Sequence, residues 1–275
     1  PFKLRYNKLI SKTAAFDSAM ASNPALAQSF HNVFIPEIQY TYTYDNSFGP
    51  NNITWTSTVS EAGSIFSGIW SICGAKGVKK LFGTPFSQFV RAQTQVVWNR
   101  KIGSMNLVSR FLLGAAHAFG NSSEVPYSAQ FYIGGANSVR AFPVRSIGPG
   151  RYCPTEIRPN GYYDQTGTFK FETNCELRFP ILGYLKGALF LDAGNVWLLK
   201  KDDYRPGGEI TLKHFLNDLA LGTGVGVRFD MDMLVLRADL GIGIHAPYDT
   251  GKSGYFNMPS FKDSLGFHLA IGYPF

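Results

Sequence analysis

FKFETNCELRF, residues 169–179, consists of two interleaved series of side chains. One series is mainly apolar, and the other holds lysine, glutamate, asparagine and arginine. Because successive side chains of a strand point to opposite faces, the stretch predicts a strand with one apolar face and one charged face. It is longer than the roughly five or six residues of a typical globular strand, and it suits a tilted strand that crosses a bilayer.

The same alternation recurs from residue 33 to the end of the chain. Residues 11–32 are rich in alanine and predict a short helix or helical loop instead, interrupted at Pro24. The predicted strands lie near residues 1–10, 34–45, 52–60, 63–73, 86–100, 104–119, 167–179, 185–197, 217–230, 233–246 and 262–275. Short turns alternate with long loops, as is typical of outer-membrane barrels. The turns are Glu61-Ala62, Lys101-Ile102-Gly103, Ile181-Leu182-Gly183 and Met231-Asp232, and the loops are 74–85, 120–166, 198–216 and 247–261.

The composition also favours a membrane barrel. Charged residues make up 16% of the 275 residues and aromatic residues 15%, whereas an ordinary soluble domain has about 25% charged residues. No apolar run reaches the roughly 18 residues of a membrane helix, but a closed barrel satisfies its backbone by pairing strands. The predicted fold is an all-β transmembrane antiparallel barrel of the outer-membrane type. A soluble β-sandwich or ligand-carrying barrel is the alternative, and it would bury the apolar faces.

Several other classes of function lack the residues that they need. The net charge of +7 comes from scattered lysines and arginines, without the basic aromatic motif of a nucleic-acid fold. The cysteines Cys73, Cys153 and Cys175 match no zinc spacing. We find no metal site, no cofactor motif and no nucleophile–base set, so we expect a protein that is not an enzyme.

The long loop at 120–166 contains GGANSVRAF, residues 134–142, with one cation at Arg140. Loops longer than about 15 residues in compact proteins are usually functional or disordered. The strands that follow carry carboxylates on their polar faces, which could receive this cation.

The segment FYIGGANSVRAF, residues 131–142, resembles the BamA/TamA superfamily of outer-membrane insertases, whose sixth extracellular loop carries a GG-x-x-x-VRGF-type motif. Two further patterns of that family follow in order, at residues 174–180 and 190–197. In the family the loop folds back into the barrel, and its arginine contacts carboxylates on the inner wall. Ala141 stands where the family usually has glycine. The matching loop residues are Gly134, Gly135, Val139, Arg140 and Phe142.

The resemblance implies partners for the loop arginine. Glu176 and Asp192 lie in the two further motifs, with side chains directed inward. A guanidinium suits two-pronged bonding to carboxylates, so we hypothesise that Arg140 docks on both. An ordinary exposed loop arginine is the alternative. The remaining inward charges predict a network of ion pairs in the lumen: Arg91, Arg110, Lys170, Glu172, Arg178, Arg228, Arg237 and Asp239.

The last stretch, FHLAIGYPF at 267–275, ends the chain on an aromatic residue. It resembles the C-terminal β-signal by which the assembly machinery recognises outer-membrane proteins. The residues of this signal are Phe267, Gly272, Tyr273 and Phe275. We expect Tyr273 and Phe275 to stand in the aromatic girdle at the periplasmic interface.

The family barrel has about sixteen strands and follows periplasmic POTRA domains. We therefore predict that residues 1–275 form one outer-membrane barrel domain, incomplete at its N-terminus and without POTRA domains. The predicted domain is the C-terminal part of a 16-stranded barrel. A naturally small barrel of about twelve strands is the alternative.

The resemblance implies work in the bacterial outer membrane, as an assembly factor that folds or inserts other β-barrel proteins. A client strand would pair with a seam between the first and last strands. The implied partners are outer-membrane lipid, unfolded client proteins and periplasmic or lipoprotein accessory subunits, without nucleic acid. The alternatives are a polypeptide secretion pore of the two-partner type and a passive diffusion porin.

Overall fold

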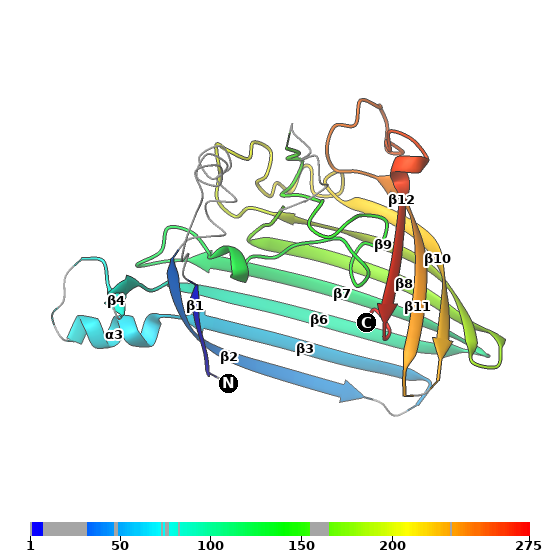
Figure 1. The fold of residues 1–275 in the computed structure, drawn as a ribbon, viewed down its shortest axis with the longest axis horizontal. Helices are drawn as coiled ribbons and strands as arrows, with labels where there is room; N and C mark the ends of the chain where they lie inside the picture. Colours follow the sequence, from blue (N-terminus) through cyan, green and yellow to red (C-terminus); the bar gives the residue numbers. More distant parts are fainter. Residues whose placement is uncertain are drawn as a thin grey trace. The chain divides into compact units, whose positions relative to one another are not determined.

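The computed structural model describes residues 2–7, 32–46, 49–72, 74, 77–81, 83–154, 165–231 and 233–275. The helix predicted at 11–32 lies outside these residues. Ten strands form one sheet in the order β1-β2-β3-β6-β7-β8-β9-β10-β11-β12 (Figure 1). They are β1 Phe2–Asn7, β2 Val33–Asn46, β3 Asn51–Ala62, β6 Phe89–Ile102, β7 Met105–Ala118, β8 Phe169–Leu182, β9 Leu185–Trp197, β10 Ala220–Asp230, β11 Val235–His245 and β12 Leu265–Ile271.

The smaller elements lie in the connections between these strands. A hairpin of β4 (Lys80–Leu81) and β5 (Thr84–Pro85) follows the helix α3 (Ser64–Ile72). Two short 3-10 helices, η1 and η2, span Tyr127–Ala129 and Lys262–Ser264. In the described part of the chain, no helix has the length and apolar character needed to cross a membrane.

The chain divides into two compact units, which are described separately below. The first contains residues up to Tyr42 together with Ser57–Gln93 and Gly114–Gln130. The second contains Thr43–Thr56, Thr94–Leu113 and Phe131–Phe275. The loop motif, its predicted carboxylate partners and the last strand all belong to the second unit.

The strands of the second unit bury their polar side chains and expose their apolar ones. On β11, Arg237 and Asp239 are buried, whereas Leu236 and Leu240 are 44% and 40% exposed. This arrangement is the reverse of a soluble sandwich, which hides its apolar face. It suits a wall that presents its apolar side to lipid and its polar side to an enclosed interior. We call the face with the buried polar side chains the inner face.

The connections alternate in length, as the sequence predicts. Only a few residues separate β6 from β7, β8 from β9 and β10 from β11. The connections from β3 to β6, β7 to β8, β9 to β10 and β11 to β12 are much longer. Because the chain reverses at each connection, the short turns lie at one end of the strands and the long loops at the other. In outer-membrane barrels the long loops are extracellular.

The strand predicted at 63–73 is wrong, because residues Ser64–Ile72 form α3. The turn predicted at Glu61-Ala62 is also wrong, since β3 continues to Ala62 and the chain turns at Gly63, whose φ is +83°. The isoleucines of this stretch recur at spacings of four and three residues, which is typical of a helix and not of a strand. The Glu61 carboxylate accepts a hydrogen bond from the Ser64 N–H (2.6 Å) and so caps the first turn.

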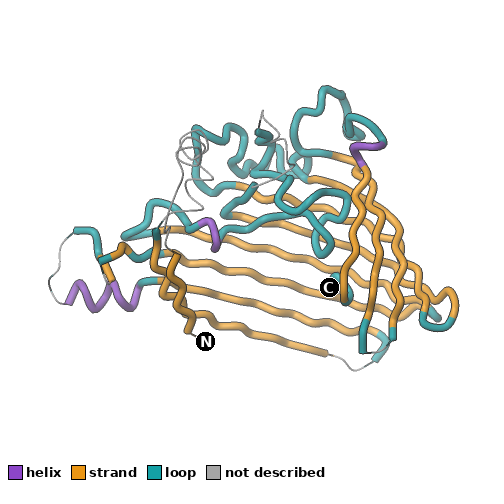
Figure 2. The backbone as a smooth tube through the Cα atoms, viewed as in Figure 1, coloured by secondary structure: helices purple, strands orange, loops and turns teal. Residues whose placement is uncertain are grey.

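Residues 131–154 of the connection between β7 and β8 fold back along the strands of the second unit instead of standing away from them (Figure 2). Phe131 pairs with Gly167 across its base, and the Arg145 N–H donates to the Ile133 carbonyl (2.9 Å). Ile133, Val139 and Ile147 are fully buried. The described part of this long loop is therefore a packed element, which explains how it can hold a side chain in a defined place.

Candidate functional site

The tip of the loop is closed by its two glycines. Gly134 and Gly135 have φ of +95° and +91°, in the left-handed region that favours glycine. A Cβ on Gly134 would collide with the Pro143 carbonyl. The Gly135 N–H donates to the Phe142 carbonyl (2.8 Å), and the Ser138 N–H donates to the Gly135 carbonyl (3.0 Å). These bonds fold residues 134–142 into a compact turn with Arg140 near its tip.

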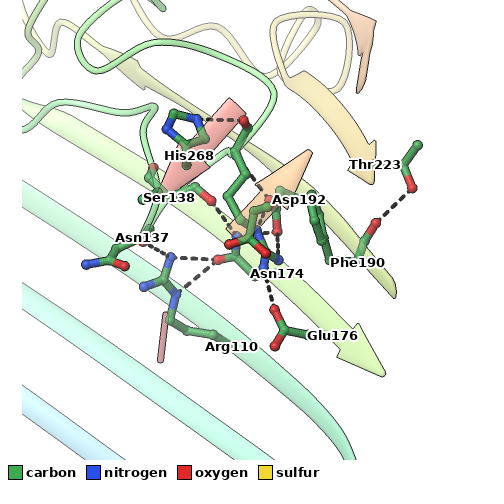
Figure 3. A network of polar contacts seen from close by, with 12 residues as sticks. Arg110, Asn137, Ser138, Asn174, Glu176, Phe190, Asp192, Thr223 and His268 are labelled. Atoms are coloured by element: carbon green, nitrogen blue, oxygen red, sulfur yellow. Dashed lines mark hydrogen bonds and ion pairs between the residues drawn. The ribbon is translucent and has the colours of Figure 1, made fainter. Parts of the chain in front are cut away.

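Arg140 is fully buried and contacts both carboxylates that the sequence suggests. Its Nε donates to Asp192 Oδ2 (2.8 Å) and its Nη2 to Asp192 Oδ1 (2.9 Å), so the pair is bidentate. Its Nη1 donates to Glu176, and its backbone N–H donates to Asp192 (3.1 Å). The guanidinium carbon also lies 3.6 Å from the centre of the Phe190 ring, within reach of a cation–π contact. Figure 3 shows this convergence of loop and strand side chains.

Strand pairing brings the carboxylates together. Asn174 of β8 faces Asp192 of β9, and Glu176 faces Phe190. All four side chains are on the inner face. The Asn174 amide donates to Asp192 (2.8 Å) and to the Ser138 carbonyl (3.1 Å), so it orients the carboxylate and holds the loop. The antiparallel register thus builds a receptor for one guanidinium from two adjacent strands.

The surroundings of Arg140 favour its charged form. Burial by itself would lower the pKa of Arg140, but the hydrogen bonds and negative charges of Asp192 and Glu176 raise the pKa above its ordinary value. The site therefore favours the charged guanidinium over the neutral form.

The charged network continues around this pair. Glu172 binds Arg110, accepts a hydrogen bond from the Ser138 hydroxyl (2.8 Å) and pairs with Lys170 (2.8 Å). Arg110 also donates to the Asn137 carbonyl of the loop (2.9 Å). Arg237 of β11 contacts the loop tip from another side.

On that second side, Arg237 donates to the Ala136 carbonyl (2.9 Å) and to Asp239 (3.1 Å). Arg228 of β10 connects Asp239 (2.5 Å) with Glu176 (3.0 Å). Four buried arginines therefore meet four buried carboxylates, and their formal charges balance. They are Arg110, Arg140, Arg228 and Arg237 with Glu172, Glu176, Asp192 and Asp239. Of the other charges predicted for the network, Lys170 and Arg178 lie at its margin, and Arg91 belongs to the first unit.

Glycines on three strands make room for the loop tip. A Cβ on Gly241 of β11 would lie 2.6 Å from the Arg140 carbonyl oxygen, and one on Gly266 of β12 would lie 2.7 Å from it. A Cβ on Gly222 of β10 would meet the Ala141 side chain at 2.5 Å. The inward glycines thus allow the backbone of the loop to touch the wall.

Ala141 takes the position of the family's usual glycine without strain. Among the described residues other than glycine, only Arg145 has a positive φ, of 61°. Ala141 therefore does not need the conformational freedom of glycine, and its methyl group fills the space that Gly222 leaves.

Possible metal ligands are scattered over the described residues. No group of three His, Cys, Asp or Glu side chains in those residues could hold a metal ion. His245 stacks on Tyr255, and its Nδ1 lies 2.6 Å from the Leu219 carbonyl. The histidine that touches the site is His268 of β12, whose Nε2 lies 2.8 Å from the Arg140 carbonyl oxygen.

Tyr273 lies at the short-turn end of the strands as expected, but the expectation that the last aromatic rings face lipid in a girdle is wrong. Phe267 points outward on β12 and is 64% exposed, but β12 ends at Ile271 and Gly272 has a φ of +84°. The Tyr273 hydroxyl donates to Asp230 (2.6 Å), and the Phe275 ring lies 5.0 Å from the guanidinium carbon of Arg110. The positive φ turns the end of the chain toward the arginines, so these rings do not stand in a lipid-facing girdle.

A family model described as the Omp85 superfamily domain matches residues 2–275. The chain belongs to the Omp85 superfamily. A curated relative, "Outer membrane protein assembly factor BamA" of Neisseria meningitidis serogroup B, is 34% identical over 90 residues. Those residues are 31% of this chain and 11% of the relative.

One solved structure shows the same fold. The crystal structure of BamA from Haemophilus ducreyi lacking POTRA domains 1–3 matches with a TM-score of 0.57 and 16% identity. The match covers 96% of this Omp85 domain and 49% of that chain, so the domain spans about half the length of that relative. CdiB from Acinetobacter baumannii matches with a TM-score of 0.38 and 14% identity, over 86% of this domain and 41% of that chain. That score is too low to support an argument.

These matches confirm the predicted family resemblance, the all-β barrel fold and the location in the bacterial outer membrane. The site of this Omp85 domain also contains residues that the sequence did not single out. Ser138, Asn174, Phe190 and His268 all touch Arg140, its carboxylates or its backbone. The signal that could have found the last three is their position in the same inward series as Glu176, Asp192 and Gly266.

Proposed function

We propose that this Omp85 domain folds or inserts other outer-membrane β-barrel proteins. The observation that carries the proposal is the loop tip fastened to the inner face by Arg140. A passive porin keeps a water-filled channel, whereas this loop tip is packed against the inner face. The relative named as an assembly factor supports the same reading, although the aligned region is a small part of that protein.

In this proposal the docked loop braces the wall near its last strand. The loop contacts β8 and β9 through Glu176 and Asp192, and β12 through His268. Among the described strands, β12 pairs only with β11. Its other edge presents backbone donors and acceptors, to which a client strand can add by β-augmentation. The resemblance to the family implies that the first and last strands form a seam that opens toward the membrane.

The proposed partners follow from this activity. The clients are unfolded outer-membrane proteins. Outer-membrane lipid contacts the apolar face of the strands. Periplasmic or lipoprotein subunits would deliver the clients. The charged network serves to position the loop, so no covalent chemistry is part of the proposed mechanism.

Depletion of the protein in its source cell tests the proposal. We expect many different barrel proteins to decline together in the outer-membrane proteome, and expression of the wild-type protein to restore them. The Arg140→Glu variant should fail to restore them, whereas Lys201→Glu, at an exposed loop lysine, should succeed.

Two other outcomes would contradict the proposal. The loss of one secreted polypeptide with normal levels of barrel proteins would identify a secretion pore of the two-partner type. A large steady single-channel conductance, with no change in barrel proteins on depletion, would identify a diffusion porin.

A further inference from the structure

Helix α3 in the first unit presents an unpartnered apolar face. Ile65, Ile69 and Ile72 are 55%, 47% and 89% exposed, and no residue of the helix is buried. Their spacing of four and three residues places them on one side of the helix. A Cβ on Gly68, on the same side, would have no neighbour within 4 Å. The helix contains no charged residue.

The opposite side of α3 is tied to the protein. The Lys79 ammonium group donates to the Ser71 hydroxyl (3.1 Å) and to the Ser67 carbonyl (3.2 Å). The Phe66 ring packs on the buried Phe86, with 6.3 Å between ring centres. These contacts fix the rotation of the helix about its axis, so the isoleucine face is turned away from the rest of the unit.

The start of α3 is also anchored to the wall. The Gly63 N–H donates to the Pro36 carbonyl (3.1 Å), and the Ser67 N–H donates to the Gly63 carbonyl in the first helical turn (2.9 Å). A Cβ on Gly63 would lie 2.5 Å from the Ser87 carbonyl oxygen, so the chain passes very close to the neighbouring segment. Figure 1 shows α3 continuing beyond the end of β3, beside β4, instead of lying across the sheet.

The position of α3 points to lipid as the material that covers its apolar face. In the same unit, Val59 of β3 and Val90 of β6 are exposed on the outward side of the strands. Because the fold is an outer-membrane barrel, this side faces lipid. The helix begins a few residues after Val59, in one of the long connections, which are extracellular in such barrels. The apolar face of α3 therefore continues the lipid-facing surface at its outer rim.

The charge of the surrounding segment fits the same occupant. Lys79 and Lys80 follow the helix, and the sequence holds no Asp or Glu between Glu61 and Glu124. Cations next to an apolar helix face are typical of helices that lie in a membrane interface. Anionic lipid headgroups attract such lysines.

We propose that α3 is an interfacial anchor, with Ile65, Ile69 and Ile72 in the acyl chains of the outer leaflet and the lysines at its headgroups. The anchor fixes the connection between β3 and β6 at the membrane surface. It is independent of the proposed assembly function, since it depends on the first unit and not on the loop tip.

Site-directed spin labelling in lipid vesicles tests the anchor. The labelled positions would be Ile69→Cys and Ile72→Cys, each in the full chain with the three native cysteines replaced by serine. Vesicles of phosphatidylcholine with phosphatidylglycerol supply the anionic bilayer. Two reference labels calibrate the measurement: Leu269→Cys on the outward side of β12, and Leu212→Cys in the β9–β10 loop, where the side chain is 92% exposed.

We expect the labels on α3 to collide with dissolved oxygen more often than with a water-soluble nickel chelate, as at Leu269. The label at Leu212 should show the reverse ratio. A ratio at both helix positions equal to that at Leu212 would overturn the proposal, because it would place the isoleucine face in water. Low collision rates with both reagents would also overturn it, since they would indicate burial against protein.

Discussion

The segment at residues 131–142 and the helix α3 at Ser64–Ile72 both lie in long connections between strands, yet their side chains have opposite environments. In the first segment a charged residue, Arg140, is fully buried. In the second, three isoleucines are exposed and no residue is charged. In a membrane barrel the interior supplies the partners for charge, and the exterior supplies the apolar solvent. Whether an exposed side chain is favourable therefore depends on whether it meets the polar interior or the lipid outside.

The two segments also differ in what holds them. Removal of one partner from a buried ion pair typically costs about 3–5 kcal/mol. Changes at an exposed surface away from special contacts usually stay within about 0.5 kcal/mol. The predictions below use this contrast, beginning with the largest effect.

Arg140→Glu should have the largest effect, because it would place a third carboxylate between Glu176 and Asp192. We expect the free energy of unfolding to fall by at least about 3–5 kcal/mol, measured by urea unfolding in detergent. Limited proteolysis should cleave the loop in the variant. Lys201→Glu, at a side chain that is 76% exposed, is the matched control and should change little. A wild-type unfolding curve and an intact loop in Arg140→Glu would refute the docking.

A double-mutant cycle on Arg140→Ala and Asp192→Ala should measure the coupling across the bidentate pair. We expect a coupling of about 2–3 kcal/mol, at the upper end of the range for residues in direct contact. The control cycle uses Lys201→Ala and Asp203→Ala, an exposed pair at 3.1 Å, which should give a coupling near zero. Equal couplings in the two cycles would mean that burial adds nothing to the Arg140 pair.

Gly241→Ala should displace the loop tip, because its Cβ would collide with the backbone of Arg140 and Ala141. Overpacking of this kind typically costs about 1–3 kcal/mol. Gly243→Ala on the same strand is the control, since its Cβ would meet only the flexible Met258 side chain, at 3.1 Å. The same unfolding measurement should separate the two variants, and an equal loss in both would show that the loop does not press on β11.

His268→Ala should have the smallest effect of the four, because it removes one hydrogen bond to the Arg140 carbonyl. We expect a loss of about 1 kcal/mol. His268→Gln can still donate from its side-chain amide and should recover part of the loss. If the two variants unfold at the same urea concentration, the histidine does not tie β12 to the loop.

The sequence predicted most of the strands and the loop motif, because both are recorded in short local patterns. Strand alternation is a local property, so the positions of β8, β9 and β11 follow from short stretches such as residues 169–179. The error at 63–73 has a local cause as well, since the isoleucines and serines of this short apolar stretch recur at spacings of three and four residues, which favour a helix over a strand. Capping by Glu61 and the turn at Gly63 decide in favour of the helix.

Some contacts around Arg140 could be predicted from the sequence, and others could not. The family motif names the arginine, and the two later motifs name Glu176 and Asp192. The motifs do not reveal that Asn174 orients Asp192, or that Phe190 stacks on the guanidinium. Those contacts depend on the register that sets Asn174 opposite Asp192, which is a property of two paired strands.

By itself, the sequence determined which residues line each face of the strands, where the long loops fall and which cation the motif at residues 134–142 carries. Side-chain alternation and short motifs carry that information, because they involve residues that are near one another in the chain. Only the tertiary structure decided that Tyr273 and Phe275 turn toward the arginines, that glycines of three strands admit the loop tip, and that α3 holds its isoleucines outward. Each of these depends on the space and charge that distant segments leave, which no local pattern records.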